Sequence, residues 1–189
     1  MSKEIDLNAF QSGNIQAFEQ LVNLYEKKVL NTCWYILQNR EEAEDATQDI
    51  FLAIYQSKHL FKGQSQLSTW IHRITVNKCL EYIRKAKRKK RFGIKVPIDD
   101  SFVMMEKHSP LNPEEELMER ERSNLFVQAI QHLSENQRIA YSLHHFEDLS
   151  YKEISESMNL SISAVESLIF RAKQQLIKQL KDPIQKNWI

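Results

Sequence analysis

The chain has 189 residues, with 26 Lys and Arg against 25 Asp and Glu, so its net charge alone indicates no partner. It has three glycines, far apart, where about thirteen would be usual for this length. Neither common glycine-rich phosphate loop can be written, which excludes the nucleotide-binding α/β enzymes that use one. Few turn-forming residues and abundant Leu, Ile, Glu, Gln, Lys and Ala predict an all-α protein.

Cysteine usage and the N-terminus exclude further classes. Cys33 and Cys79 form no CxxC pair, which excludes a disulfide scaffold and a cysteine-rich zinc knuckle. The N-terminus lacks the apolar stretch of a signal peptide, and no run approaches the ~20 apolar residues that span a bilayer. We therefore expect a soluble, cytoplasmic protein that does not itself span a membrane.

The prolines divide the chain. All four lie beyond residue 96, and three of them fall in the acidic stretch 97–116, which is typical of a linker. Helical periodicity fills residues 1–96 and returns over 117–182. The sequence therefore predicts two small helical domains, at 1–96 and 117–182, a linker at 97–116 and a tail at 183–189.

Charge is strongly segregated within the balanced total. Residues 41–49 carry five acids and no base, and residues 84–91 carry seven bases and no acid. Residues 99–121 carry eight acids against one Lys and one Arg. Such blocks fit solvated faces, separate partners, or a basic arm masked by its own acidic linker.

A first functional helix is expected from Asn39, which can cap it, to about Gln56. At ~100° per residue one side gathers small and branched apolar residues that can face a core. These are Ala43, Ala46, Thr47, Ile50 and Ile54. The opposite side gathers Asp45, Gln48, Asp49 and Leu52. That outer face could bind a basic partner or be solvated.

A second helix is expected to begin near Ser68 and to run into the basic block. One side can face the core through Ile71, Ile74, Thr75, Cys79 and Tyr82. Another side carries Trp70, Arg73, Asn77 and Arg84. These residues offer an aromatic plate for stacking, an amide for a base edge and cations for phosphate, the groups that bind single-stranded nucleic acid. The alternative is that Trp70 is ordinary core and Arg73 pairs with an acid.

The C-terminal part has the layout of a helix-turn-helix. Three capping boxes are expected, at Ser134 with Gln137, Ser150 with Glu153, and Ser163 with Glu166. They predict a short helix at about 151–158, a turn at 159–161 and a longer helix from Ser163, whose outward face would enter a major groove. The outward residues would be Ser163, Ser167, Phe170, Arg171, Gln174 and Lys178. A plain helical hairpin is the alternative.

Catalytic chemistry is not evident. His144 and His145 are adjacent, but the chain has no HExxH, and no His follows Asp or Glu at the i, i+3 spacing of di-iron bundles. No nucleophile with a base and an orienting group can be assembled. We expect no catalytic residues, no metal, no cofactor and no small-molecule substrate, and therefore not an enzyme.

Two sets of motifs resemble one family. Residues 44–51 (EDATQDIF), 61–63 (FKG) and 68–77 (STWIHRITVN) closely resemble region 2 of bacterial sigma factors of the extracytoplasmic-function type. Residues 133–138 (LSENQR), and the stretch from 149–154 (LSYKEI) through 171–173 (RAK), resemble region 4 of the same factors. The two matches come in the family's order, separated by a linker.

The resemblance implies a transcription initiation factor that binds core RNA polymerase and directs promoter recognition and melting. It implies that Asp45, Gln48, Asp49 and Leu52 bind core polymerase. It also implies a loop at 61–67 that captures a flipped base of the minus-ten element, and a recognition helix that reads the minus-thirty-five element. The implied DNA-binding residues are Phe61, Lys62, Thr69, Trp70, Arg73, Asn77, Lys78, Arg84, Ser163, Ala164, Ser167, Arg171 and Lys173. The implied partners are core polymerase, promoter DNA and an anti-sigma factor.

The chain departs from the family at a few positions. Glu166 and Leu168 stand where many relatives carry a basic residue, and Gln64 and Gln66 replace acidic or aromatic loop residues. Both promoter preferences are therefore left open. Two other classes also stay open at this stage: a regulator of the LuxR type, which binds duplex DNA without polymerase, and a helical metalloenzyme.

Overall fold

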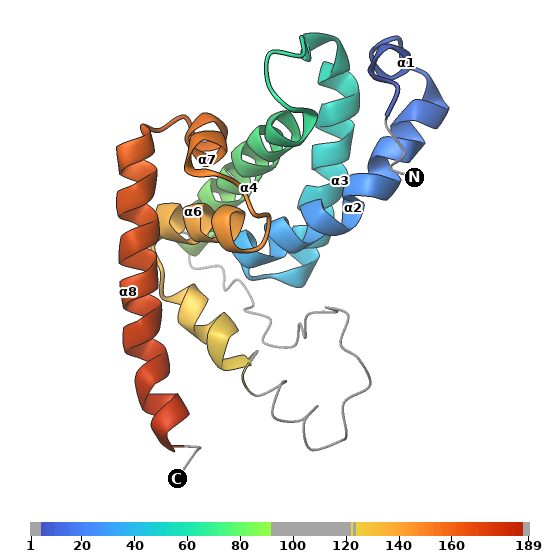
Figure 1. Ribbon diagram of the computed structural model, residues 1–189. Coiled ribbons are helices and arrows are strands. Elements are labelled where there is room, and N and C mark those ends of the chain that lie inside the picture. Colours follow the sequence, from blue (N-terminus) through green and yellow to red (C-terminus); the bar gives the residue numbers. More distant parts are fainter. Residues whose placement is uncertain (1–4, 92–121, 123, 187–189) are drawn as a thin grey trace, which may run out of the picture.

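The computed structural model describes residues 5–91, 122 and 124–186, which contain helices and no strand (Figure 1). The predicted linker at 97–116 and the acidic block at 99–121 lie outside the described residues. The elements of the first half are α1 (Leu7–Gln11), α2 (Ile15–Leu37), α3 (Arg40–Ser57), η1 (Lys58–Leu60) and α4 (Leu67–Arg91). Those of the second half are a helix at 124–131, α6 (Glu135–His145), α7 (Tyr151–Met158) and α8 (Ile162–Lys186).

Side-chain caps explain where most of these helices begin. The Asn39 side chain accepts a hydrogen bond from the Glu42 amide at 2.8 Å, as predicted for the start of α3. The capping boxes expected at Ser134 with Gln137 and at Ser150 with Glu153 are both present. Each cap supplies a partner to an amide that the first turn of a helix leaves unpaired.

The expected third capping box is wrong, because α8 begins one residue earlier than predicted. Ser161 is the capping residue: its Oγ accepts from the Ala164 amide at 3.2 Å. Asn159 takes the left-handed conformation (φ 54°), so the turn ends early enough for Ser161 to fill this place. Ser163 instead lies inside the first turn of α8, exposed to solvent. α8 also continues to Lys186, four residues into the segment predicted as a tail.

Ser161→Ala is expected to lower the free energy of unfolding by about 1 kcal/mol, since it removes this cap. Ser163→Ala, two residues later on the same helix, should change it by less than half as much. Urea unfolding of the two variants beside the wild type measures the difference. An equal loss in both would return the capping role to Ser163.

The first half is a helical core built by α2, α3 and α4, which pack against one another. The predicted inner face of α3 is buried as expected: Ala43, Ala46, Thr47, Ile50 and Ile54 are at most 7% exposed. From α4, Ile71, Thr75 and Cys79 are fully buried, whereas Ile74 and Tyr82 are half-buried. The Sγ atoms of Cys33 and Cys79 lie 3.7 Å apart between α2 and α4, with both thiols unlinked.

The second half packs α6 and α7 against α8. Val165, Ile169, Ala172 and Leu176 form the buried side of α8, as predicted, with Leu168 half-buried beside them. Ile139 and Leu143 of α6 and Ile154 of α7 are fully buried in the same hydrophobic cluster. The short α7 and the long α8 are thus held at a fixed angle around the turn at 159–161, the arrangement that a helix-turn-helix needs.

The two halves also pack on each other. α7 lies against α4, and α6 lies against α2, so residues more than a hundred positions apart are in contact (Figure 1). The last turns of α8 lie far from the N-terminal helix α1 in the same view. No helix among the described residues is both long and apolar enough to cross a bilayer.

Candidate nucleic-acid interface

The outer face of α3 is accessible. Asp45 and Gln48 are exposed, and the Leu52 side chain is 55% exposed although it is apolar. Asp49 is half-buried, because its carboxylate accepts a hydrogen bond from the Tyr82 hydroxyl at 3.2 Å. Three of the four predicted polymerase contacts are therefore displayed together, and the fourth also links α3 to α4.

Tyr82 is held in its protonated form, in which it can donate this bond. Loss of solvent, and then the nearby Asp49 carboxylate, raise the pKa of Tyr82 to about 12. Tyr82 is therefore a neutral donor to the Asp49 carboxylate at every ordinary pH. Substituting Asp49 would disturb the packing of α4 on α3 as well as the outer face.

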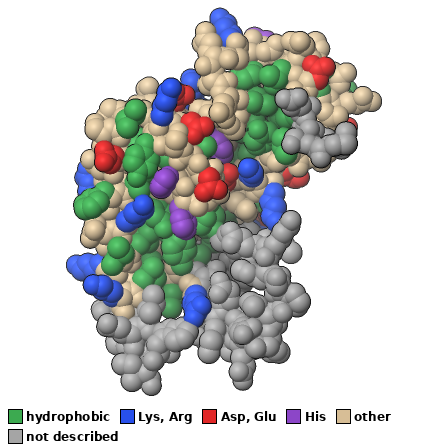
Figure 2. All heavy atoms as spheres, viewed as in Figure 1, with side chains coloured by type: hydrophobic (Ala, Val, Ile, Leu, Met, Phe, Trp, Pro, Cys, Tyr) green, Lys and Arg blue, Asp and Glu red, His purple; other side chains and the backbone are tan. Residues whose placement is uncertain are grey.

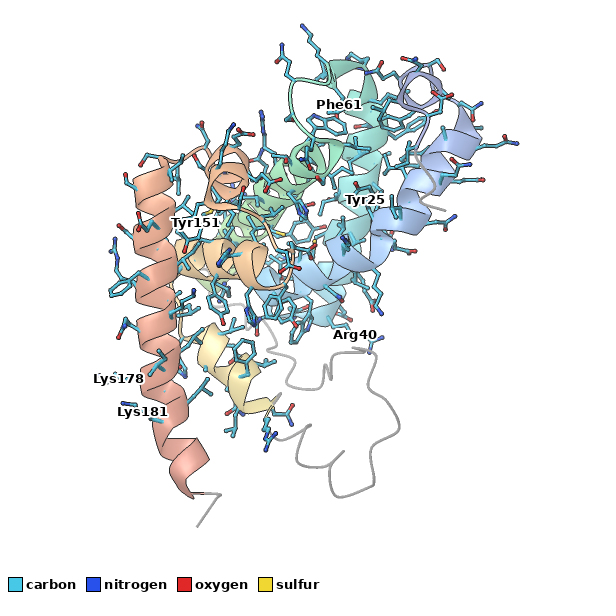
Figure 3. The ribbon with its side chains drawn as sticks, viewed as in Figure 1. Tyr25, Arg40, Phe61, Tyr151, Lys178 and Lys181 are labelled. Carbon is cyan, nitrogen blue, oxygen red and sulfur yellow. The ribbon has the colours of Figure 1, made fainter. Side chains whose placement is uncertain are left out.

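The loop between η1 and α4 has exposed polar residues on its surface and aromatic residues packed beneath them. Lys62, Gly63, Gln64 and Gln66 are exposed, and Gly63 has the left-handed φ of 69° that favours glycine. Phe61 is only 4% exposed: its ring lies 5.4 Å from that of Trp70, and its carbonyl accepts a hydrogen bond from the Gln11 side chain. Figure 3 shows Phe61 at this end of the molecule.

The predicted stripe on α4 is brought together in part. Arg73, Asn77 and Arg84 are exposed on one side of the helix, and Trp70 is half-buried at its start. Lys78 is half-buried and its Nζ lies 3.2 Å from the Glu81 carboxylate. Thr69 is 1% exposed and hydrogen-bonded to Glu153 of α7. In this structure, then, Phe61 and Thr69 are covered, while the other α4 residues offer an amide and cations to solvent.

The basic block continues α4 as a helix to Arg91. Lys85 lies over the Tyr82 ring, with its Nζ 5.0 Å from the ring centroid. Lys87 reaches the other half of the chain, where its Nζ lies 2.6 Å from the Glu135 carboxylate. Two lysines of the basic block, Lys85 and Lys87, therefore already interact with groups of the same chain.

The recognition face of α8 is exposed. Ser163, Ser167 and Arg171 follow one another at four-residue spacing, and the Arg171 Nε donates to the Ser167 carbonyl at 3.2 Å. Ala164 is half-buried beside them. Lys173 does not share this face, because two residues turn a helix by about 200°. Lys178 points outward from the far part of α8 (Figure 3).

Lys173 belongs instead to the rim of an apolar groove of about 560 Å³. The groove is lined by Phe126, Tyr141, Lys173, Leu176, Ile177, Leu180 and Lys181. Figure 2 shows hydrophobic side chains over this part of the surface with Lys and Arg side chains near them. Sequence reasoning missed the groove, since its walls come from three separate helices.

His144 and His145 have packing roles. The His144 Nδ1 lies 3.1 Å from the Leu149 carbonyl, and its ring meets that of Tyr151 edge-on. His145 stacks on Tyr141 at 5.2 Å. Over the described parts of the chain, no group of three or more His, Cys, Asp or Glu residues could hold a metal ion.

Comparison with known proteins agrees with this geometry. Residues 21–89 match the model for sigma-70 region 2, and residues 123–176 match that for sigma-70 region 4. The ECF RNA polymerase sigma factor SigW of Bacillus subtilis is 30% identical over 174 residues, which cover 91% of this chain and 93% of that protein. The chain belongs to the sigma factors of the extracytoplasmic-function type.

Other relatives agree. The RNA polymerase sigma-H factor of Pseudomonas aeruginosa is also 30% identical over 174 residues, 90% of each chain. Among solved structures, the sigma factor RpoE in complex with the anti-sigma factor NepR from Bartonella quintana has the same fold. Its TM-score is 0.73 at 22% identity, over 89% of this chain and 99% of that one. The structure of CnrH with the cytosolic domain of CnrY has a TM-score of 0.65 at 22% identity, over 92% and 94%.

This sigma factor is therefore a transcription initiation factor that directs promoter-specific transcription by RNA polymerase, and it is not an enzyme. The match to region 2 sets aside a LuxR-type regulator, which would not need that half, and family membership sets aside a helical metalloenzyme. We call α2–α4 region 2 and residues 124–186 region 4 below. The contacts between the two regions were not foreseen, because no periodicity within either half signals them.

Proposed function

We propose that the two halves divide the work of promoter recognition. Region 2, within residues 1–96, binds core polymerase and the minus-ten element. Region 4, within 117–182, binds the minus-thirty-five element, with a linker at 97–116 and a tail at 183–189. The observation that carries this division is that an acidic face on α3, a cationic face on α4 and a hydroxyl-and-arginine face on α8 are displayed separately on one chain.

The polymerase contact is proposed at the outer face of α3. A carboxylate at Asp45, an amide at Gln48 and an exposed apolar side chain at Leu52 suit a basic helical partner that also offers apolar area. Asp49 contributes from the edge of this face while holding Tyr82.

The minus-ten contact is proposed for the loop at 61–67 and the start of α4. Extruding a base costs a few kcal/mol, which stacking must offset. Trp70 supplies an accessible ring for stacking, and the buried Phe61 ring packs against it. Arg73, Asn77 and Arg84 would contact the single DNA strand along α4. Lys62 and Lys78 add charge near phosphates. Thr69 can take part only after Glu153 moves away from it.

The minus-thirty-five contact is proposed for the first turns of α8. Ser163, Ser167 and Arg171 lie on one exposed face that fits a major groove, with Ala164 beside them for apolar contact. Lys173 lies around the helix from that face and would meet a phosphate rather than a base.

We also propose an anti-sigma protein as a partner and the cytoplasm as the location of this protein. One of the similar structures is a sigma factor in complex with an anti-sigma factor, and the lysine-rimmed apolar groove of region 4 is a surface that an apolar helix of such a protein could fill. A factor that acts on RNA polymerase and binds DNA is expected in the cytoplasm.

Run-off transcription tests the whole proposal. Purified chain, bacterial core polymerase and fragmented genomic DNA are combined, and the transcript starts are sequenced. New starts that share paired upstream elements are expected. No new starts, together with tight binding of duplex DNA by the chain alone, would contradict the proposal.

Arg171→Ala is expected to lower transcription from those promoters by about 10- to 100-fold, since a good base contact is worth ~1–3 kcal/mol. Transcription should decrease from promoters that share the minus-thirty-five element. It should stay unchanged from promoters that are recognised mainly through the minus-ten element. Lys178→Ala is the control, because it removes one exposed cation from the same helix two turns away. Equal losses in both variants would mean that Arg171 supplies only charge.

A further inference from the structure

The two cysteines of the chain touch inside region 2. The Cys33 Sγ of α2 and the Cys79 Sγ of α4 lie 3.7 Å apart, and the Cys79 thiol donates a hydrogen bond to the Cys33 sulfur. Both side chains are fully buried, and both thiols are free. At this distance no atom lies between the two sulfurs. Because the chain has no other cysteine, each thiol has one possible disulfide partner within the chain.

The packing of the two helices suits a bond between these sulfurs. α2 and α4 pack directly against each other. Packed helix axes lie about 8–10 Å apart and Cα atoms lie ~2.3 Å from each axis, so facing Cα atoms come within roughly 3.5–5.5 Å. Disulfides join Cα atoms about 4.4–6.8 Å apart, with ~2.05 Å between the sulfurs. Side-chain rotation and a small shift of the helices would bring the sulfurs from contact to this bond length.

We propose that Cys33 and Cys79 are a reversible oxidation site, at which a hydroperoxide converts the two thiols into a disulfide that ties α2 to α4. This bond is not a permanent disulfide scaffold, because the thiol reductants of a cytoplasm return it to the dithiol. The chain segment that the bond would close, residues 33–79, contains the outer face of α3 and the loop at 61–67.

The reaction with hydrogen peroxide balances in two steps. The Cys33 sulfur, as its thiolate, attacks one peroxide oxygen and the O–O bond breaks, which gives a Cys33 sulfenic acid and one water. The Cys79 sulfur then attacks the sulfenic sulfur. The S–S bond forms, the S–O bond breaks, and the departing hydroxide takes the Cys79 proton and leaves as a second water. The two sulfurs together lose two electrons, which the peroxide oxygens gain.

The hydrogen bond assigns a different part to each sulfur. Cys79 donates to Cys33, and a donor stabilises negative charge that develops on its acceptor, so Cys33 is placed to react first. The same hydrogen bond, and then burial, raise the pKa of Cys79, so Cys79 keeps its proton until the second step. The charge of Arg138 on α6 works against this rise, and its buried Nε has no hydrogen-bond partner among the described residues. A cation so placed offsets part of the cost of a thiolate in this core.

A digest of the full chain, made without reductant, tests the site. The folded chain is exposed to hydrogen peroxide, denatured with N-ethylmaleimide present, and digested. The peptides that hold Cys33 and Cys79 should be joined and carry no maleimide, and a thiol reductant added before the maleimide should separate them. Two maleimide-labelled cysteines after peroxide, a link between two chains, or a cysteine sulfinic acid in place of the joined peptides would overturn the proposal.

Oxidised glutathione is the control for unfolding. It is a charged tripeptide disulfide, which cannot reach side chains that are 0% exposed, so the same exposure should leave both thiols of the folded chain free. In denaturant it should react with both. Equal reaction of the folded chain with peroxide and with oxidised glutathione would mean that only unfolded chains react, and would overturn a site that depends on the fold.

Two variants test the order of the steps. Cys79→Ser keeps a hydroxyl donor beside Cys33 but removes the second sulfur, so a Cys33 sulfenic acid should accumulate under peroxide and be trapped by dimedone. Cys33→Ser is the matched control, and dimedone should label its Cys79 at least fivefold less. Equal labelling would overturn the assigned order. Circular dichroism checks that both variants fold, and the digest of the wild type depends on neither.

The disulfide should also raise the midpoint of thermal unfolding by about 5 °C or more, because it restricts the unfolded chain. Wild type is compared before and after peroxide, with Cys33→Ser treated alike as the control. An unchanged or lower midpoint would mean that the bond strains α2 and α4, and would overturn its fit to this fold.

An effect on transcription rests on the proposed function. Drawing α4 toward α2 displaces Arg73 and Asn77 relative to the outer face of α3, so the oxidised chain, freed of peroxide, should give at least threefold less promoter-specific transcription. Reduction should restore it, and Cys33→Ser should not respond to peroxide. Joined peptides with unchanged transcription would keep the oxidation site and overturn this effect. No specific transcription from the reduced chain would instead contradict the proposed function.

Discussion

Asp45→Lys combined with Leu52→Ala is expected to lower the affinity for core RNA polymerase by 100-fold or more. Reversing a charge that faces a basic partner costs several kcal/mol, and losing an exposed apolar anchor costs ~1–3 kcal/mol more. At 1.4 kcal/mol per tenfold, the sum exceeds two orders of magnitude. Fluorescence anisotropy of labelled chain against increasing core polymerase measures it.

The chain offers a closely matched control for this variant. Glu19→Lys with Leu24→Ala makes a matching charge reversal and the same leucine truncation on α2, where Leu24 is 53% exposed against 55% for Leu52. The control should bind polymerase as the wild type does. Equal weakening in both would show that net charge, and not the α3 face, carries the contact.

Asp49 is left out of the variant for a structural reason. Its carboxylate accepts from the Tyr82 hydroxyl, so Asp49→Ala would loosen α4 from α3 and confuse a binding defect with a packing defect. Asp49→Asn keeps an acceptor oxygen and is the appropriate substitution there. Circular dichroism and thermal unfolding of each variant should match the wild type.

The free energy of unfolding is expected to fall by about 2 kcal/mol between pH 7 and pH 5 because of His72. Burial, and then the charge of Lys28, lower the pKa of His72 from 6.5 to about 4, against an opposing effect of Glu153. The imidazole is 3% exposed, and its Nδ1 has no hydrogen-bond partner among the described residues.

The sign follows from which state binds the proton. Below pH 6.5 the unfolded chain protonates His72 while the folded chain keeps it neutral, so stability is lost as the pH falls toward 4, to a total of about 3 kcal/mol. Neighbouring carboxyls also titrate. Burial raises the pKa of Glu147, which works in the opposite direction, and the Ser150 hydrogen bonds lower that of Glu153, which adds to the acid loss.

Comparison with His72→Leu isolates the histidine from these carboxyls. Urea unfolding at pH 7 and pH 5 should show a drop about 2 kcal/mol smaller in His72→Leu than in the wild type. Equal drops would mean that His72 titrates alike in both states.

Much of the local structure follows from the sequence. The core side of α3, the buried side of α8, two capping boxes and the left-handed turn at Asn159 could all be predicted. Each of these depends on residues within one helix or one turn, whose spacing the chain itself sets. The acidic face of α3 could be predicted in the same way, because it lies opposite the apolar side that is buried.

Other features could be assigned only from the folded chain. Phe61 and Thr69 have the residue types of a DNA-contacting loop, yet they are covered by Trp70 and by Glu153 of the other half. Lys173 is two residues from Arg171 but faces a groove whose walls come from separate helices.

The sequence by itself determined the helices, their inner faces and the family, because helical periodicity and motif spacing are local properties of the chain. Tertiary structure alone decided that Thr32 meets Glu147, that Tyr35 lies on Phe146 and that His72 is kept neutral. Those contacts join residues on the outer surfaces of the two halves, and each of these surfaces would face water if its half were alone. Their partners are chosen by the shape and charge of two separate faces, which no spacing along the chain encodes.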